Sequence, residues 1–514
     1  MVLMPKSGTD LSSQPDGSCG AGGLARVLES LETILLIAVV VCGFFTVVRT
    51  VIRMQSPFEM DYAEGTIFNT AWRSAQGGAL YQPLRGMPYQ IDPYPPLIYK
   101  LVGSVLKHTG PSFFYPRMLA LAAAIVACLL AAVLIHHWIH RWKLALAFGL
   151  LPLTVAAVQP WLGTIRYDLV GIALTMAGLV IFVLFPRYRF WALPFFVLAV
   201  AGLYTLVAAP AACCLYLWTE REKPKSILFG ACLAIPLMAA FLYGQHATAG
   251  YMGYHLFKTQ HSPYSVSQLA SFVQTLLRSY CLLFLLSAVV VWKGIRERKV
   301  SLIALYWLLV TGTTLSLGKI GAAQNHVLQL VFASSIGAAV AYDWMRRNSS
   351  GDWGLPLVVA TLALMTMANA PLRPRKPIEE LSDCARAYAA VRGELGDRIL
   401  SDNVGALVLA GKEVYISDPF VYGWLVKGAG FPDDDLRRMV ASGEFTSIVL
   451  DRGVESQETD EDRWPDGVRQ TIRQHYQLKQ EFTCNDARFV YQPKAVSFAG
   501  PGDQGGSRAG AHGD

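Results

Sequence analysis

Residues 31–52, LETILLIAVVVCGFFTVVRTVI, form an apolar run long enough to cross a bilayer as one helix, and the polar segment FEMDYAEG follows at 58–65. The chain is 53 % hydrophobic and only 16 % charged, which is far from the average of soluble proteins. Ten further apolar runs lie downstream, at 115–136, 143–160, 167–185, 190–205, 206–219, 226–244, 274–292, 300–317, 327–345 and 353–371. The sequence therefore predicts a polytopic α-helical membrane protein with about 11 transmembrane helices, two of which share the stretch 190–219 and break near Pro210.

The basic residues indicate the orientation of these helices. They occupy alternate connections between the apolar runs, namely Arg141 and Lys143, Arg187 and Arg189, Arg221 to Lys225, Lys293 to Lys299, and Arg346 and Arg347. Short loops rich in Lys and Arg face the cytoplasm, so the N-terminus is expected inside and the C-terminus outside, although Arg373, Arg375 and Lys376 depart from this pattern. Orientation also accounts for the net charge of +7, and no nucleic-acid partner is expected.

The chain divides into four parts by composition. We expect a disordered cytoplasmic tail at 1–27, a transmembrane domain at 28–371 with a large first outer loop at 53–114, an extracytoplasmic domain at 372–498 and a disordered tail at 499–514. Short apolar segments such as RILSDN, EVYIS, TSIVLDRG and ARFVYQP alternate with helical patterns after residue 377, which predicts a small soluble α/β domain. Cys384 and Cys484 both lie in this domain and can form a disulfide if it faces an oxidising compartment.

Polar side chains from distant parts of the sequence are predicted to meet at the outer face. Asp61 and Glu64 lie in the first outer loop, Arg166 and Asp168 in a later outer turn, and Lys319, Asn325 and His326 in the last one. Carboxylates suit a hydroxyl that must lose a proton, and Arg or Lys suits a phosphate that gathers negative charge. Each residue also has a structural alternative: Asp61 and Glu64 as helix-capping acids, Arg166 and Asp168 as an ion pair, and the others as interfacial polar groups.

Several motifs together resemble a known family. DYAEG at 61–65, GGALYQP at 77–83, PYPPL at 93–97, RYD at 166–168 and GKIGAAQN at 318–325 occur in an order, and on a predicted side of the membrane, similar to bacterial GT-C glycosyltransferases of the protein mannosyltransferase and aminoarabinose transferase type, which are family 39-like. The resemblance implies a GT-C type fold in the bacterial inner (cytoplasmic) membrane. Because Tyr62 and Ala63 separate the two acids, both Asp61 and Glu64 stay candidates for the catalytic base.

The resemblance also implies an activity: transfer of a sugar from a polyprenyl-phosphate donor to a lipid, glycan or protein acceptor on the outer side, with inversion. Asp61 or Glu64 would take the acceptor proton, Arg166 or Lys319 would meet the phosphate, and Asp168, Asn325, His326 and Tyr94 complete the expected binding residues. Some members require a divalent cation and others do not, so a metal stays an open alternative and no other cofactor is expected. The competing interpretation is a transporter or flippase of a lipid-linked sugar, whose ionisable groups would instead lie near the bilayer midplane.

Overall fold

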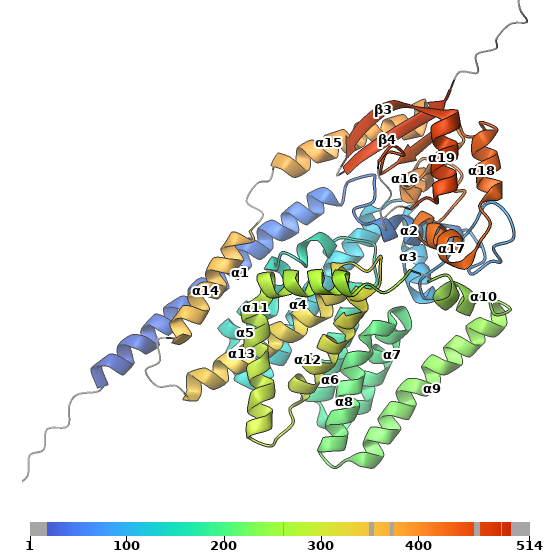
Figure 1. Ribbon diagram of the computed structural model, residues 1–514. Coiled ribbons are helices and arrows are strands. Elements are labelled where there is room, and N and C mark those ends of the chain that lie inside the picture. The colour runs from blue at the N-terminus through green and yellow to red at the C-terminus, as the bar shows by residue number, and fades with distance from the viewer. Residues whose placement is uncertain are drawn as a thin grey trace, which may run out of the picture.

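The computed structural model describes residues 18–260, 262–348, 354–370, 375–456, 463–484 and 486–494 (Figure 1). Residues 1–17 of the expected N-terminal tail and the whole expected tail at 499–514 lie outside this part of the chain. The first helix begins at Ser18, so residues 18–27 are helical although the sequence predicted disorder there.

The body of the molecule is a bundle of helices (Figure 1). Its α-helices are α1 (Ser18–Arg53), α4 (Phe114–Ile139), α5 (Trp142–Leu150), α6 (Asp168–Leu184), α7 (Leu193–Gly202), α8 (Ala208–Thr219), α9 (Lys223–Ala247), α11 (Val266–Arg296), α12 (Leu302–Thr313), α13 (Leu328–Asn348) and α14 (Gly354–Ala368). Each apolar run predicted from the sequence contains one of these helices. By length and composition, four spans among the described residues can cross a membrane, or five if the bent α11 counts as one span, so the number of crossings stays a prediction.

Two helices differ from their predicted form. The stretch 190–219 breaks at Leu203, whose backbone is extended (φ −154°, ψ 105°), and Pro210 lies in the first turn of α8, where the missing N–H of proline costs no helical hydrogen bond. Helix α11 bends by 91° between Arg278 and Cys281, and its first half runs across the bundle below the C-terminal residues (Figure 1).

Short helical turns connect these elements. They are η1 (Leu151–Thr154), η2 (Gln159–Trp161), η3 (Pro186–Ala192), η4 (Tyr204–Val207), α10 (Tyr251–Gly253), η5 (Tyr254–Lys258), η6 (Thr314–Gly318) and η7 (Gln324–Val327).

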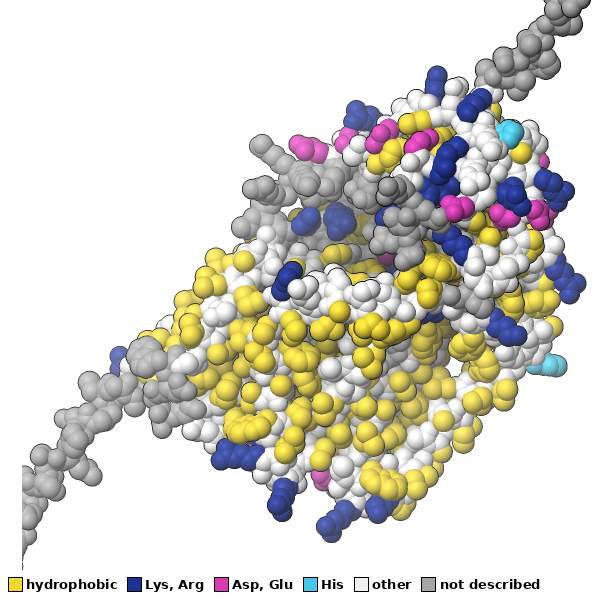
Figure 2. All heavy atoms as spheres, viewed as in Figure 1, with side chains coloured by type: hydrophobic (Ala, Val, Ile, Leu, Met, Phe, Trp, Pro, Cys, Tyr) yellow, Lys and Arg dark blue, Asp and Glu magenta, His cyan; other side chains and the backbone are white. Residues whose placement is uncertain are grey.

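The surface of the helical body is apolar. Figure 2 shows hydrophobic side chains covering the bundle, while Lys and Arg lie on the C-terminal residues and at the edge of the bundle opposite them. Ile37, Phe44, Tyr243, Ile295 and Leu357 are among the large hydrophobic side chains that are exposed on the helices. An apolar surface of this extent is typical of a protein embedded in lipid. The chain is thus a multi-pass helical membrane protein, and the sidedness of its termini stays a prediction.

The C-terminal residues combine a sheet with helices above the bundle (Figure 1). The strands β1 (Ile399–Ser401), β2 (Ser447–Leu450), β3 (Tyr476–Cys484) and β4 (Asp486–Pro493) lie in the order β1-β2-β4-β3. β1 and β2 are parallel, and the other two pairs are antiparallel. The helical elements are α15 (Arg375–Ala389), η8 (Ala390–Glu394), α16 (Val404–Leu409), α17 (Pro419–Ala429), α18 (Asp434–Ala441) and α19 (Asp466–His475). A disulfide between Cys384 and Cys484 joins α15 to the end of β3.

The segment EVYIS at 413–417 does not join this sheet, so the strand predicted there is wrong. It instead forms an isolated parallel bridge between Ile416 and Tyr89 of the first outer loop. The Tyr89 amide donates to Tyr415 O at 2.8 Å, and the Ser417 amide donates to Tyr89 O at 3.1 Å. The C-terminal residues are therefore fastened to the first outer loop by main-chain hydrogen bonds.

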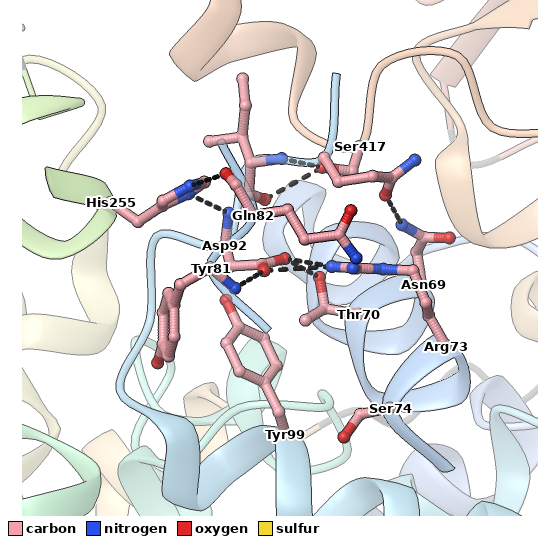
Figure 3. A network of polar contacts seen from close by, with 12 residues as sticks. Asn69, Thr70, Arg73, Ser74, Tyr81, Gln82, Asp92, Tyr99, His255 and Ser417 are labelled. Atoms are coloured by element: carbon pink, nitrogen blue, oxygen red, sulfur yellow. Dashed lines mark hydrogen bonds and ion pairs between the residues drawn. The ribbon is translucent and has the colours of Figure 1, made fainter. Parts of the chain in front are cut away.

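The first outer loop is itself folded around one buried carboxylate. It contains α2 (Tyr62–Ala75) and α3 (Pro96–Thr109), which lie between the bundle and the C-terminal sheet (Figure 1). Asp92 is fully buried and accepts from Arg73 Nη2 at 2.7 Å, Thr70 Oγ1 at 2.9 Å and the Tyr81 amide at 2.7 Å (Figure 3). A carboxylate with this many donors holds the irregular stretch after α2 in one conformation.

His255 of η5 links a second outer loop to the same point. Its Nδ1 accepts from the Asp92 amide at 3.0 Å, and its Nε2 lies 2.8 Å from Gln82 O (Figure 3). These partners suit the neutral ring with the proton on Nε2, and burial lowers the pKa of this histidine. His255 is thus a structural residue that ties the loop after α9 to the first outer loop.

Candidate functional site

Asp61 occupies the N-cap of α2, where a side-chain acceptor satisfies a free amide. Its backbone is extended (φ −141°, ψ 141°), and its Oδ2 accepts from the Ala63 amide at 3.2 Å. The side chain also forms an ion pair with Arg166, whose Nη1 lies 2.6 Å from Asp61 Oδ2. Asp61 therefore does cap a helix, and it also faces a cavity.

Arg166 stands between two carboxylates. Its Nε lies 3.2 Å from Asp168 Oδ2, at the start of α6, while its Nη1 contacts Asp61. Burial lowers the pKa of the guanidinium, but both carboxylates raise it, and the net change is upward, so Arg166 stays charged. The guanidinium also packs over the Trp161 ring at 5.5 Å.

The polar contacts of Asp61, Arg166 and Asp168 continue into the last outer turn. Asn325 Nδ2 donates to Asp168 Oδ1 at 2.9 Å, and Asn325 Oδ1 is buried without a hydrogen-bond partner. Lys319 Nζ donates to Gln260 Oε1 at 3.2 Å, and burial lowers the pKa of its ammonium. His326 Nδ1 lies 2.9 Å from Ser316 Oγ. Three segments that are far apart in the sequence thus meet on one wall, as predicted. We call it the membrane-side wall (Asp61, Arg166, Asp168, Lys319, Asn325 and His326).

Glu64 is in a different place. Its side chain and that of Arg117 in α4 are both 0 % exposed, and Arg117 Nη2 lies 2.8 Å from Glu64 Oε2. The amides of Ile165 and Met60 also donate to this carboxylate, at 2.7 and 2.6 Å. Arg117 uses its remaining donors on the carbonyls of Met54, Ser56 and Phe58. Glu64 is thus fully paired inside the protein and does not line the cavity.

Glu59, the first acid of FEMDYAEG, binds the C-terminal residues. Its Oε1 accepts from the Gly405 amide at the start of α16. Burial raises the pKa of Glu59 to about 7. Gly65 allows this approach, since a Cβ atom there would lie 2.4 Å from Glu59 Oε1 and 3.0 Å from the Gly405 amide nitrogen. The three acids of this segment therefore have three different environments.

A cavity of about 1290 Å³ lies between the membrane-side wall and the C-terminal residues. Asp61, Tyr94, Arg166, Asp168, Lys319, Asn325 and His326 all line it. Every residue that was predicted for catalysis or substrate binding is brought to this cavity, except Glu64.

The opposite wall was not predicted. Tyr62 directly follows Asp61, and its hydroxyl donates to Asp418 Oδ1 and accepts from the Phe420 amide at 2.8 Å. Arg463 lies over the Tyr62 ring at 4.5 Å and pairs with Asp451. We call this the C-terminal wall (Tyr62, Phe420, Asp451 and Arg463). Asp402, Asp418 and Trp464 also line the cavity.

Asp418, which holds Tyr62, and Arg117, the partner of Glu64, were not predicted, but each has a signal in the sequence. Asp418 precedes Pro419, which is the N-cap and N1 pattern of a helix start, and Asp418 accepts from the Val421 amide at 2.9 Å. Arg117 is a lone charge at the start of a long apolar run, where an ionisable side chain is expensive and needs a partner.

The described residues also test the metal alternative. They include no group of three or more His, Cys, Asp or Glu side chains that could hold a metal ion. On the membrane-side wall the two carboxylates already share the charge of Arg166, so a divalent cation does not fit between them.

We compared the chain with known proteins, and the similarity lies in the fold. No protein-family model matches the chain, and no curated protein matches it. Among solved structures, ArnT from Cupriavidus metallidurans bound to undecaprenyl phosphate is similar, with 12 % identity, a TM-score of 0.57, and coverage of 89 % of this chain and 99 % of that one. The chain has the fold of ArnT.

A second structure agrees with the first. ArnT from the same organism in the apo state shows 11 % identity and a TM-score of 0.55, and the match covers 94 % of this chain and all of that one. The aminoarabinose transferase type of fold expected from the motifs is thereby confirmed. At this identity the likeness shows the fold alone.

Proposed function

We propose that the chain is a membrane glycosyltransferase that transfers a sugar from a polyprenyl-phosphate donor to an acceptor hydroxyl at the outer face of the bacterial inner membrane. The observation that carries this proposal is the membrane-side wall, where a carboxylate exposed to a large cavity lies 2.6 Å from a guanidinium and a lysine lines the same cavity. The fold shared with ArnT, which was crystallised with undecaprenyl phosphate, supports the donor class.

Asp61 is the proposed base. It accepts the proton of the acceptor hydroxyl while the hydroxyl oxygen bonds to the anomeric carbon, and the bond from that carbon to the phosphate oxygen breaks. The leaving polyprenyl phosphate carries the electron pair, and Arg166 and Lys319 stabilise its negative charge. A single displacement of this kind inverts the anomeric centre. We do not propose Glu64 for this role, because Arg117 and two amides bind its oxygens inside the protein.

Binding of the donor can release Asp61 from its ion pair with Arg166. A phosphate that enters the cavity competes with Asp61 for Arg166, and Asp168 keeps the guanidinium in place through a second nitrogen. Asn325 in turn orients Asp168, and its unpaired Oδ1 is available to a donor hydroxyl. Once Arg166 faces the phosphate, Asp61 is free to accept a proton.

The decisive experiment is sugar transfer by the purified protein in nanodiscs from a panel of radiolabelled polyprenyl-phosphate sugars. Asp61→Asn should lower the rate of transfer by about 100-fold or more, because a general base is lost. The matched control is Asp434→Asn, which changes an exposed acid of α18 that is paired with Arg437 and does not line the cavity, and it should retain full activity. Unchanged transfer in Asp61→Asn would refute the assignment of the base, and movement of the lipid between leaflets without turnover would favour a flippase.

A further inference from the structure

The cavity is larger than one substrate requires. Pockets for a single small ligand enclose roughly 300–1000 Å³, whereas this cavity measures about 1290 Å³. The membrane-side wall supplies the groups that a sugar phosphate needs. The C-terminal wall therefore borders space that the donor's phosphate does not use.

Asp61 lies where the two walls meet. Its carboxylate belongs to the membrane-side wall through Arg166, while the next residue, Tyr62, is held by the C-terminal residues through Asp418 and the Phe420 amide. The Phe420 ring reaches back across this boundary: a Cβ atom on Gly321, in the turn that carries Lys319, would lie only 2.6 Å from it. A group bound on either wall can thus approach Asp61.

The surface of the C-terminal wall joins aromatic rings to a rigid polar pair. The Phe420 and Tyr62 rings are 6.0 Å apart in an edge-on arrangement. Beside them Asp451 and Arg463 form an ion pair in which 18 % and 23 % of the side chains stay exposed. Asn403 donates to Asp451 Oδ1 at 2.8 Å, and Arg488 Nε lies 3.2 Å from the same oxygen, so this carboxylate cannot swing away.

The geometry of a single displacement places the acceptor beside the C-terminal wall, and this step rests on the proposed function. In a single displacement the attacking hydroxyl and the leaving phosphate lie on opposite faces of the sugar ring. If Arg166 and Lys319 hold the phosphate, then the acceptor approaches from the C-terminal wall.

We infer that Tyr62, Phe420, Asp451 and Arg463 form an acceptor subsite for a sugar unit of a neutral glycan. The aromatic rings offer an apolar surface for the C–H face of a sugar, and the carboxylate and guanidinium offer fixed acceptors and donors for its hydroxyls. An anionic acceptor fits less well, because the charges of Arg463 and Arg488 are balanced by two carboxylates, Asp451 and Asp402. A protein acceptor is usually bound along a strand edge or in an apolar groove, and these four side chains form neither.

Binding can be measured without a donor, which separates this inference from the proposed function. The full-length protein in nanodiscs is titrated with neutral oligosaccharides (maltoheptaose, mannohexaose and arabinohexaose), with an oligogalacturonate and with a Ser/Thr-rich peptide, using saturation-transfer NMR. We expect the wild type to bind at least one neutral oligosaccharide more tightly than the other two probes. Phe420→Ala and Arg463→Met should each raise its Kd by about 10-fold or more.

A matched control completes the experiment. Phe431→Ala alters an aromatic residue of the same region that does not line the cavity, and it should bind the oligosaccharide within about twofold of wild type. Equal affinity in wild type and Phe420→Ala, no binding of any neutral probe, or preference for the anionic or peptide probe would each overturn the inference. Phe420-dependent binding in a protein that transfers no sugar would instead overturn the proposed function and leave the glycan site standing.

Discussion

Two ion pairs that begin in the same short segment, Asp61–Arg166 and Glu64–Arg117, have opposite relations to solvent. The first has 15 % of each side chain exposed to the cavity, and the second has 0 % exposed. The chemistry of the partners is the same. The comparison shows that two acids of one short motif can differ in whether a substrate can reach them.

The largest effect is expected from breaking the buried pair. Glu64→Gln leaves the charge of Arg117 unpaired in the interior, which should lower the free energy of unfolding by about 3–5 kcal/mol. Thermal unfolding in the same nanodisc should show a clear drop in Tm, while Asp61→Asn should change the Tm little. If Glu64→Gln instead folds with the wild-type Tm and loses sugar transfer, Glu64 is the base and the comparison fails.

Glu59 adds a third carboxylate, buried like Glu64 but without a close cationic partner; Asp451 and Arg488 are the charged groups that face it. Its pKa rises from 4.5 in the unfolded chain to about 7 in the fold. The folded protein therefore retains a proton that the unfolded chain releases, and its stability falls by about 3 kcal/mol as the pH rises from 4.5 to 7.

Glu59→Gln should remove this part of the pH dependence and make the variant more stable than wild type at pH 8. The measurement is the difference in Tm between variant and wild type across this pH range. Asp402 and Asp418, whose pKa values burial raises to about 6, act in the same direction, and Asp451, whose pKa is lowered, acts in the opposite one. Using the difference cancels these shared contributions. A difference that does not change with pH would contradict the assignment.

A conservative change in each arginine sharpens the comparison. Lysine offers one point charge and cannot reach Asp61 and Asp168 with two separate nitrogens, so Arg166→Lys should lower kcat by about 10- to 100-fold with a small change in Tm. Arg117→Lys should do the reverse, with a lower Tm and nearly normal kcat per folded molecule. Equal losses of kcat in both variants would mean that the two ion pairs contribute to catalysis together and do not have separate roles.

The smallest effect concerns the boundary between the two walls. Gly321 has a positive φ of 86°, and an added Cβ would lie 2.6 Å from the Phe420 ring. Gly321→Ala should therefore destabilise the protein by about 1 kcal/mol. Adding Phe420→Ala removes the overlap but not the backbone strain, so the double variant should be less destabilised than the sum of the two single changes. Strict additivity of the Tm shifts would show that the ring and the turn are not in contact.

Local patterns were sufficient for most of the helical body. All the predicted apolar runs contain helices, because a long uncharged segment has few alternatives in a bilayer. The breaks inside them were harder to predict, since no proline lies at the kink in α11 or next to the extended residue Leu203.

The site was predicted in part. Asp61 and Glu64 are three residues apart, which suggests a shared helical face, but Asp61 is an N-cap with extended φ and ψ, while Glu64 lies within the first turn of α2. The two side chains therefore diverge. The C-terminal wall depends on contacts such as Tyr62 with Asp418, which are separated by 356 residues, and no local pattern reports such a pairing.

The seam between residues 403–417 and the first outer loop has an evolutionary consequence. Gly405 meets Glu59, Ser417 O accepts from Thr66 Oγ1 at 3.0 Å, and Ser417 Oγ bonds both the amide and the carbonyl of Ile91. Neither side of this seam can drift in sequence without a matching change in the other. A chimera that exchanges C-terminal residues between relatives should keep its catalytic centre only if the first outer loop is exchanged with them.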